Sequence, residues 1–220
     1  MVRRRNRLPT VTVKCDPKVG EASPVFNTLR PKIEAVELPP GYELEWGGEY
    51  EDSGDAQAAL VGKLPVTFLF MVLIVIFLFN SIRKPMVIFL TVPLAIIGVT
   101  AGLLVTGQPF GFMALLGMLS LMGMLIKNAI VLMDEIGLQM GEGKGPFTAI
   151  VDSGVSRMRP VSMAALTTVL GMIPLLADAF FVAMAVTIMF GLTFATILTL
   201  IVVPVLYACF FKIPSPQPRS

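Results

Sequence analysis

The sequence predicts a mostly α-helical membrane protein, in which five transmembrane helices follow a small α+β segment. Three observations predict this class. Of the 220 residues, 55% are hydrophobic and only 15% are charged, which is a low share for a soluble domain. Nearly all of the polar sequence lies in residues 1–63. Residues 64–211 then contain five long apolar runs, which is typical of membrane-spanning helices.

Residues 1–48 have the pattern of a β-α-β unit. Leu8–Lys14 alternates and is β-branched, which predicts a strand, and Glu21–Val36 carries apolar residues at helical spacing. Tyr42, Leu44 and Trp46 alternate with glutamates and predict a second strand. One such unit has too little core to stand alone, so we expect it to complete a sheet whose other strands lie outside this chain.

The predicted helices begin with residues 49–63, which lead directly into the membrane. The five spans that follow are residues 64–80, 86–106, 110–136, 160–177 and 180–211, and residues 212–220 form a tail. Pro93 lies inside the second span, and internal prolines are tolerated in membrane helices, where they often cause kinks. Gly98 and Gly102 form a GxxxG pair that permits close helix packing.

The connection between the third and fourth spans is the longest, and Pro146–Ser153 within it predicts a short amphipathic helix on the cytoplasmic surface. Lysine and arginine occur in this connection, after the first span and after the fifth, whereas residues 106–109 and 177–179 have neither. The positive-inside rule places the basic loops and the C-terminus in the cytoplasm. The N-terminal segment is then outside the cytoplasm.

Lys127, with Asn128 beside it, interrupts the third span. A lysine at the centre of a membrane helix costs roughly 2.5–3.5 kcal/mol on insertion scales, so it needs a partner, a water-filled cavity or a function. Ser120, Gly123 and Asp134 share its helix face, but Asp134 is about 10 Å away along the axis, too far for a direct ion pair. Two interpretations remain: the lysine extends toward an interface, or it pairs with carboxylates from another segment and serves in proton transfer.

Several classes of site are excluded by composition. The chain has no histidine and two distant cysteines, Cys15 and Cys209, so histidine-based zinc sites and Ser-His-Asp triads are excluded. No cofactor or metal is predicted, and the methionines of the third span are interpreted as core residues. The net charge of +2, without basic stretches interleaved with aromatics, indicates no nucleic-acid partner. The sequence has no phosphate-binding loop for ATP.

Four motifs resemble the resistance-nodulation-division (RND) exporters, the proton-driven efflux pumps of Gram-negative inner membranes. GMLIKNAIVLMDEI is similar to their lysine-bearing helix, and LPPGYELEWGGEYEDS to the end of their periplasmic porter region. The two membrane helices that follow the lysine-bearing helix in these exporters are similar to RMRPVSMAALTTVLGMIPL and VVPVLY. The order of the motifs is preserved, and the multidrug, hydrophobe/amphiphile branch of acriflavine-resistance type is the most similar.

The resemblance implies that this chain is the C-terminal part of a proton/drug antiporter and is not an enzyme. The whole pump would be a homotrimer with twelve helices per subunit, joined to a periplasmic adaptor and an outer-membrane channel. Lys127 would pair with two aspartates on a helix of the missing N-terminal repeat. Arg157 would lie at the cytoplasmic entrance, while the family's relay threonine corresponds to Ala164, with Thr167 and Thr168 about a turn later.

Two alternatives to the drug exporter remain open. The chain could belong to an RND-type transporter for metals, lipids or protein export. It could also be an inactive truncated remnant, or an interaction subunit that binds other membrane helices.

Overall fold

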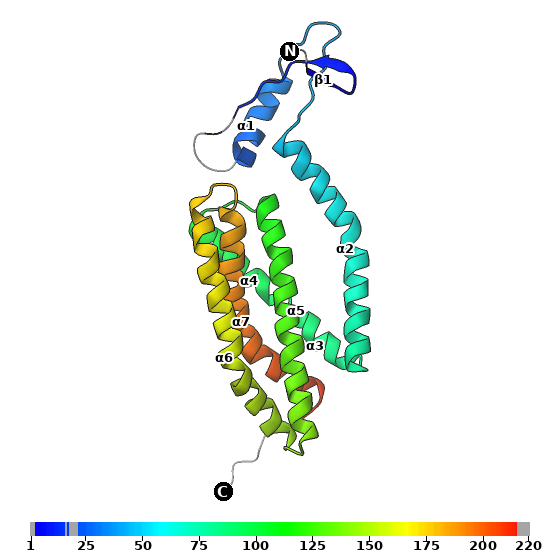
Figure 1. The fold of residues 1–220 in the computed structure, drawn as a ribbon, viewed down its shortest axis with the longest axis vertical. Helices are drawn as coiled ribbons and strands as arrows, with labels where there is room; N and C mark the ends of the chain where they lie inside the picture. The colour runs from blue at the N-terminus through cyan, green and yellow to red at the C-terminus, as the bar shows by residue number, and fades with distance from the viewer. Residues whose placement is uncertain (1–2, 16, 18–21, 215–220) are drawn as a thin grey trace. The chain divides into compact units, whose positions relative to one another are not determined.

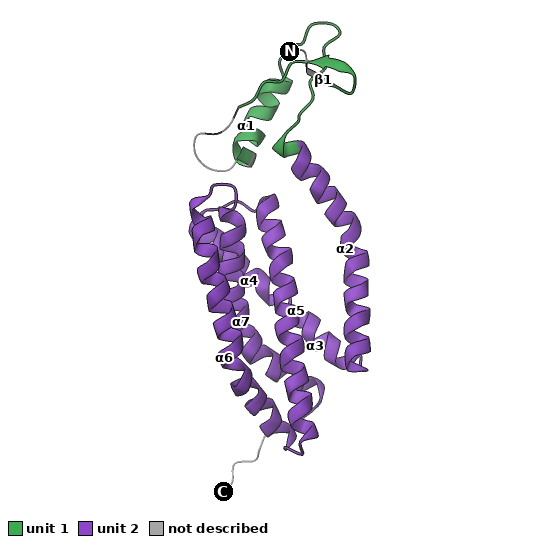
Figure 2. Ribbon diagram, in the orientation of Figure 1, with its two compact units in different colours: residues 1–50 green, residues 51–220 purple. Residues whose placement is uncertain are grey.

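The computed structural model describes residues 3–15, 17 and 22–214 (Figure 1). Glu21, at the predicted start of the first helix, and residues 215–220 of the predicted tail lie outside this part. The chain divides into two compact units, residues 1–50 and residues 51–220 (Figure 2). The first unit contains the polar segment, and the second contains the apolar helices.

The first unit contains a β-hairpin and one helix. Strand β1 (Arg3–Arg5) pairs antiparallel with β2 (Leu8–Thr10). Asn6 and Arg7 connect the strands with φ angles of 51° and 69°. Two consecutive residues with positive φ form a tight turn whose twist matches that of the paired strands. Helix α1 (Ala22–Glu34) follows. The predicted strand Leu8–Lys14 therefore ends early, at Thr10, and its partner precedes it in the chain.

The predicted second strand, residues 42–46, is wrong. These residues form no strand, and the described sheet consists of β1 and β2 alone. An alternating segment needs a neighbouring strand to supply its hydrogen bonds. Here Trp46 contacts α1 instead: its Nε1 donates to Glu34 Oε1 at 3.1 Å, and its ring lies edge-on to Phe26 at 4.9 Å. In the described unit, a hairpin and a helix are thus followed by a connector without a strand.

Helix α2 (Glu49–Phe79) joins the predicted leading helix and the first span into a single helix of 31 residues. At about 1.5 Å per residue it is roughly 46 Å long, more than the hydrocarbon core requires. Near its C-terminal end Val75 is buried, and the ring of Phe68 lies 5.2 Å from that of Phe89 on the following helix. The final turns of α2 therefore contact α3, while most of this helix is exposed.

The second span is divided by a proline. Helix α3 (Arg83–Thr91) ends before Val92 and Pro93, and helix α4 (Leu94–Thr106) resumes directly afterwards. Because proline has no N–H, the chain crosses this point with tighter bonds: Val92 N donates to Phe89 O, and Ala95 N to Val92 O. The span still counts as one membrane-length segment, Arg83–Thr106.

The last three spans are helices α5 (Phe112–Gly141), α6 (Pro146–Met172) and α7 (Val182–Phe210), and the 3₁₀ turn η1 (Ile173–Ala177) extends α6. The predicted separate surface helix at Pro146–Ser153 is wrong, because α6 runs unbroken from Pro146 through Pro160. Within the described residues, five helices are long and apolar enough to cross a membrane.

Helix α7 is the centre of the second unit, with α3, α4, α5 and α6 packed on it (Figure 1). Glycines bring the backbones together. A Cβ atom on Gly98 would lie 2.7 Å from Phe194 Cβ, and one on Gly102 would lie 2.5 Å from Phe190 Cβ. On α7, a Cβ atom at Gly191 would lie 2.3 Å from a Leu121 methyl group. The GxxxG pair therefore lies where α4 meets α7.

Candidate functional site

Lys127 is the sixteenth of the 30 residues of α5 and lies on a side of that helix that the described helices of the second unit leave uncovered. Ser120, Gly123, Lys127 and Asp134 are all exposed there, and we call them the lysine stripe. The other side of α5 carries its buried residues, among them Leu125 and Ala129. A charged group on a membrane-length helix is thus directed away from the core of the described bundle.

Within the described part of the chain, Lys127 makes no hydrogen bond and no ion pair. Asp134 lies on the same stripe, about 10 Å along the helix axis at seven residues' rise, so it does not neutralise the ammonium group directly. The lysine stripe can therefore accept a partner from outside this set of helices.

Asn128 lies on a different side of α5 from Lys127. It is partly buried, between Leu125 and Leu132 in the helical repeat, at the edge of the face that packs into the bundle. Consecutive residues of a helix are about 100° apart, so Asn128 points toward the edge of the packed face while Lys127 points to the uncovered side.

Thr167 and Thr168 form hydrogen bonds within their own helix. Thr167 Oγ1 donates to Met163 O and Ala164 O at 3.0 Å each, and Thr168 Oγ1 donates to Ala164 O at 2.9 Å. Among the contacts of the described residues, neither hydroxyl bonds to α5. The structure therefore does not bring these threonines together with Lys127.

Arg157 lies on α6, and the resemblance predicted it at the cytoplasmic entrance of that helix. It pairs with Glu135, which was not among the predicted site residues. Its Nη2 donates to Glu135 Oε2 on α5, in a pair whose side chains are only 30% and 17% exposed. The Arg157 Nε is buried without a partner among the described residues. Such a pair is more shielded from water than a surface ion pair, which increases its electrostatic attraction.

The pair extends into a chain of polar contacts, which we call the Glu135 network. Gln139 Nε2 donates to Glu135 Oε1 at 3.0 Å, and Lys144 Nζ donates to Gln139 Oε1 at 3.2 Å and to Asp152 Oδ2 at 3.0 Å. The network joins the end of α5, the connecting turn and the beginning of α6. The i,i+4 spacing of Glu135 and Gln139 was the available sequence signal.

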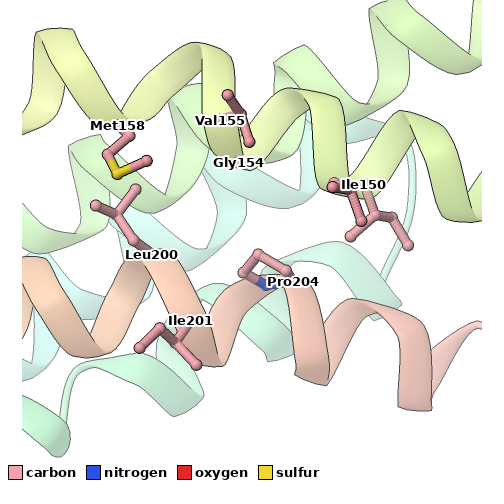
Figure 3. Close-up of a pocket in the computed structure, with 8 residues that line it drawn as sticks. Ile150, Gly154, Val155, Met158, Leu200, Ile201 and Pro204 are labelled. Carbon is pink, nitrogen blue, oxygen red and sulfur yellow. The ribbon is translucent and has the colours of Figure 1, made fainter.

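A shallow apolar groove lies between α6 and α7 (Figure 3). It encloses about 350 Å³ and is lined by Ile150, Val151, Gly154, Val155, Met158, Leu200, Ile201 and Pro204. None of these side chains has a group that ionises, and Met158 supplies the one sulfur atom of the lining. In the described part of the chain, no three or more His, Cys, Asp or Glu side chains are grouped to hold a metal ion.

The sequence model of the AcrB/AcrD/AcrF family matches residues 1–211. The chain belongs to this family. Its members are RND transporters, so the resemblance seen in the sequence is confirmed at the level of the family.

The relatives have more than one substrate class in their names. The chain is 31% identical to the nickel and cobalt resistance protein CnrA of Cupriavidus metallidurans over 80% of its length, and 30% identical to the multidrug export protein AcrF of Escherichia coli over 93%. It covers 17% and 20% of those two proteins. The prediction of the multidrug branch is therefore not specifically supported.

The fold is also found in a solved structure. The crystal structure of a heavy metal efflux pump superposes on 87% of this chain with a TM-score of 0.66 and 29% identity, and the chain covers 20% of that pump. The chain thus spans about a fifth of the length of its relatives. The helical fold agrees with an RND membrane region, whereas the partial β-α-β subdomain is only weakly supported.

Proposed function

We propose that this chain supplies the lysine helix of a proton-driven RND exporter, with Lys127 in the proton-coupling network. The observation that supports the proposal most is the lysine stripe. An ammonium group lies halfway along an apolar helix, on a side that the described bundle leaves uncovered. Charged residues within membrane segments commonly pair with one another and carry proton relays.

The expected partners of Lys127 are carboxylates on a membrane helix of the N-terminal repeat, outside this chain. At about 4 Å, two opposite unit charges attract by roughly 4 kcal/mol at an effective dielectric constant of 20. Protonation of the carboxylates removes this attraction and releases Lys127. A change of several kcal/mol is enough to move a two-state arrangement of helices from one state to the other.

The proposal includes the location and the assembly of the complete transporter. The transporter lies in the bacterial inner membrane, with the first unit in the periplasm and the end of α7 in the cytoplasm, as the basic loops indicate. RND pumps generally form trimers with an adaptor and an outer-membrane channel, and we expect the complete transporter to do so. Arg157, Asn128, Thr167 and Thr168 are proposed to contribute to the proton path.

For the substrate we propose amphiphilic organic compounds, and a divalent metal ion is the second candidate. The second candidate is favoured by the similarity to CnrA and to a heavy metal efflux pump. Cells that produce the complete transporter should be tested for resistance to cationic dyes and detergents, and separately to nickel, cobalt, zinc and cadmium. Resistance to the metals alone would refute amphiphile export and leave proton coupling unaffected.

Proton coupling is tested by Lys127→Ala in the complete transporter, with Lys212→Ala as the control. Lys212 is an exposed lysine beyond α7, so its loss should leave resistance unchanged. Lys127→Ala should abolish resistance while membrane insertion and abundance stay normal. Resistance at the unmutated level in Lys127→Ala would refute the proton-coupling role.

A further inference from the structure

Glu135 is the residue through which α5 makes its ion pair with α6. Its two carboxylate oxygens have separate partners: one accepts from Arg157 on α6, and the other accepts from Gln139 on α5. Gln139 is itself buried, and its Oε1 accepts a hydrogen bond from Lys144 Nζ. Glu135 is therefore the centre of the Glu135 network rather than a member of the lysine stripe.

The position of Glu135 relates the network to Lys127. Eight residues separate the two, which corresponds to about 12 Å along α5 and about 80° around it. When the carboxylate of Glu135 faces α6, Lys127 is consequently turned toward the uncovered side. A rotation of α5 about its axis would break the contact between Glu135 and Arg157, and the same rotation would change the direction of Lys127.

At this end α5 and α6 are held by a small apolar contact, in which Ile150 joins the buried cluster of Ile136, and by the polar contacts of the Glu135 network. The connection, residues 142–145, contains Gly143 with a φ of 87°, and such glycines impose little constraint on the helices that they join. The buried residues of the first two turns of α6 are the small or medium side chains Ala149, Ile150 and Ser153. The directional contacts of Glu135 add to this packing and can therefore fix the rotation of this end of α5 against α6.

We propose that Glu135 is a positioning residue for proton coupling: through Arg157 it sets the rotation of α5, and with it the direction of Lys127. This inference rests on the proposed function of Lys127. It assigns Glu135 no proton of its own to transfer. Its consequence is that loss of the Glu135 charge changes the surroundings of Lys127 without a contact between the two side chains.

The test uses the complete transporter in proteoliposomes, with transport measured across a range of pH. Glu135→Gln keeps the shape but loses the charge, and Glu135→Asp keeps the charge. Glu142→Gln is the matched control, since Glu142 is an exposed acid at the end of the same helix. We expect Glu135→Gln to lower the transport rate about three- to thirtyfold, the range of coupling changes from residues outside a site, and to shift the pH midpoint. Glu135→Asp should recover most of the rate and restore the midpoint.

Two results would overturn the inference. One is a Glu135→Gln variant with the unmutated rate and midpoint. The other is a lower rate at an unchanged midpoint, because loss of folded protein alone reduces the rate without moving the midpoint. If Glu135→Gln does not accumulate, Gln139→Leu decides, because it removes the partner of the other carboxylate oxygen: a shifted midpoint supports the positioning role, and the unmutated midpoint refutes it.

The proposed function fails separately. If Lys127→Ala transports normally, proton coupling through the lysine is wrong, whatever Glu135 does. If Lys127→Ala is inactive while Glu135→Gln behaves like the control Glu142→Gln, only the positioning role of Glu135 is wrong.

Discussion

Replacing Gly98 by alanine should separate two helices that are in direct contact. The new Cβ atom would lie 2.7 Å from Phe194 Cβ and 2.9 Å from the carbonyl oxygen of Phe190. Ordinary contacts begin near 3.4 Å, so α4 and α7 must move apart by 0.5–0.7 Å at this point. Neither opposing atom is the end of a flexible side chain, so the backbones have to move.

The cost of such overpacking is typically about 1–3 kcal/mol. The matched control is Gly171→Ala on α6, where a new Cβ atom would meet none of the described residues within 4 Å. The assay is thermal unfolding of the purified complete transporter in detergent, with urea unfolding as a second measure. Gly98→Ala should lower the unfolding temperature, whereas Gly171→Ala should leave it unchanged or raise it. Equal unfolding temperatures for the two variants would refute the close approach of α4 and α7.

Two further predictions concern ion pairs outside the helix core. Hydrogen bonds from Arg30 and then from Trp46 lower the pKa of Glu34, so their stabilising effect is present above the ordinary glutamate pKa and is lost as the pH falls through the lowered value. Fluorescence of Trp46, the one tryptophan of this chain, should therefore change at a pH below about 4.3, and Glu34→Gln should remove that step. A step in Glu34→Gln at the same pH would contradict this assignment. The exposed pair of Lys144 and Asp152 should matter little: Asp152→Asn is expected to change the free energy of unfolding by less than about 1 kcal/mol, as measured by urea unfolding.

The membrane helices could be predicted from sequence because the bilayer leaves the chain few choices. Backbone groups in hydrocarbon must be hydrogen-bonded internally, so a long apolar run forms a helix whatever surrounds it. The break at Val92 and Pro93 could likewise be anticipated, since proline lacks the N–H that a continuous helix requires. The run from Pro146 through Pro160 could not, because a proline in a membrane helix can be tolerated without a boundary.

The strand at residues 42–46 could not be settled from its pattern alone. Alternation of apolar and charged residues is typical of a strand with one buried face, but the hydrogen bonds of that strand come from a neighbouring strand. In the described unit, Trp46 and Tyr50 pack on Phe26 of α1 instead, with ring distances of 4.9 and 4.5 Å. A local pattern therefore predicted the wrong local structure where the partner was the deciding factor.

The candidate site likewise has one residue that could be selected from the sequence and one that could not. Lys127 could be selected from sequence because a single charge in an apolar run is conspicuous. Glu135 could not, because its importance depends on Arg157, which is 22 residues away on another helix. Gly191 is a similar case: one glycine in α7 is unremarkable until Leu121 and Val99 are found against it.

The central claim concerns the surroundings of one amine, and the most direct measurement is the distance from Lys127 Nζ to the nearest carboxylate oxygen. It can be made in an experimental structure of the complete transporter in a lipid nanodisc at neutral pH. The account predicts at least one carboxylate within about 4 Å, the range of an ion pair, contributed by a helix outside this chain. A Lys127 ammonium group in the head-group layer, with no acid within reach, would contradict it.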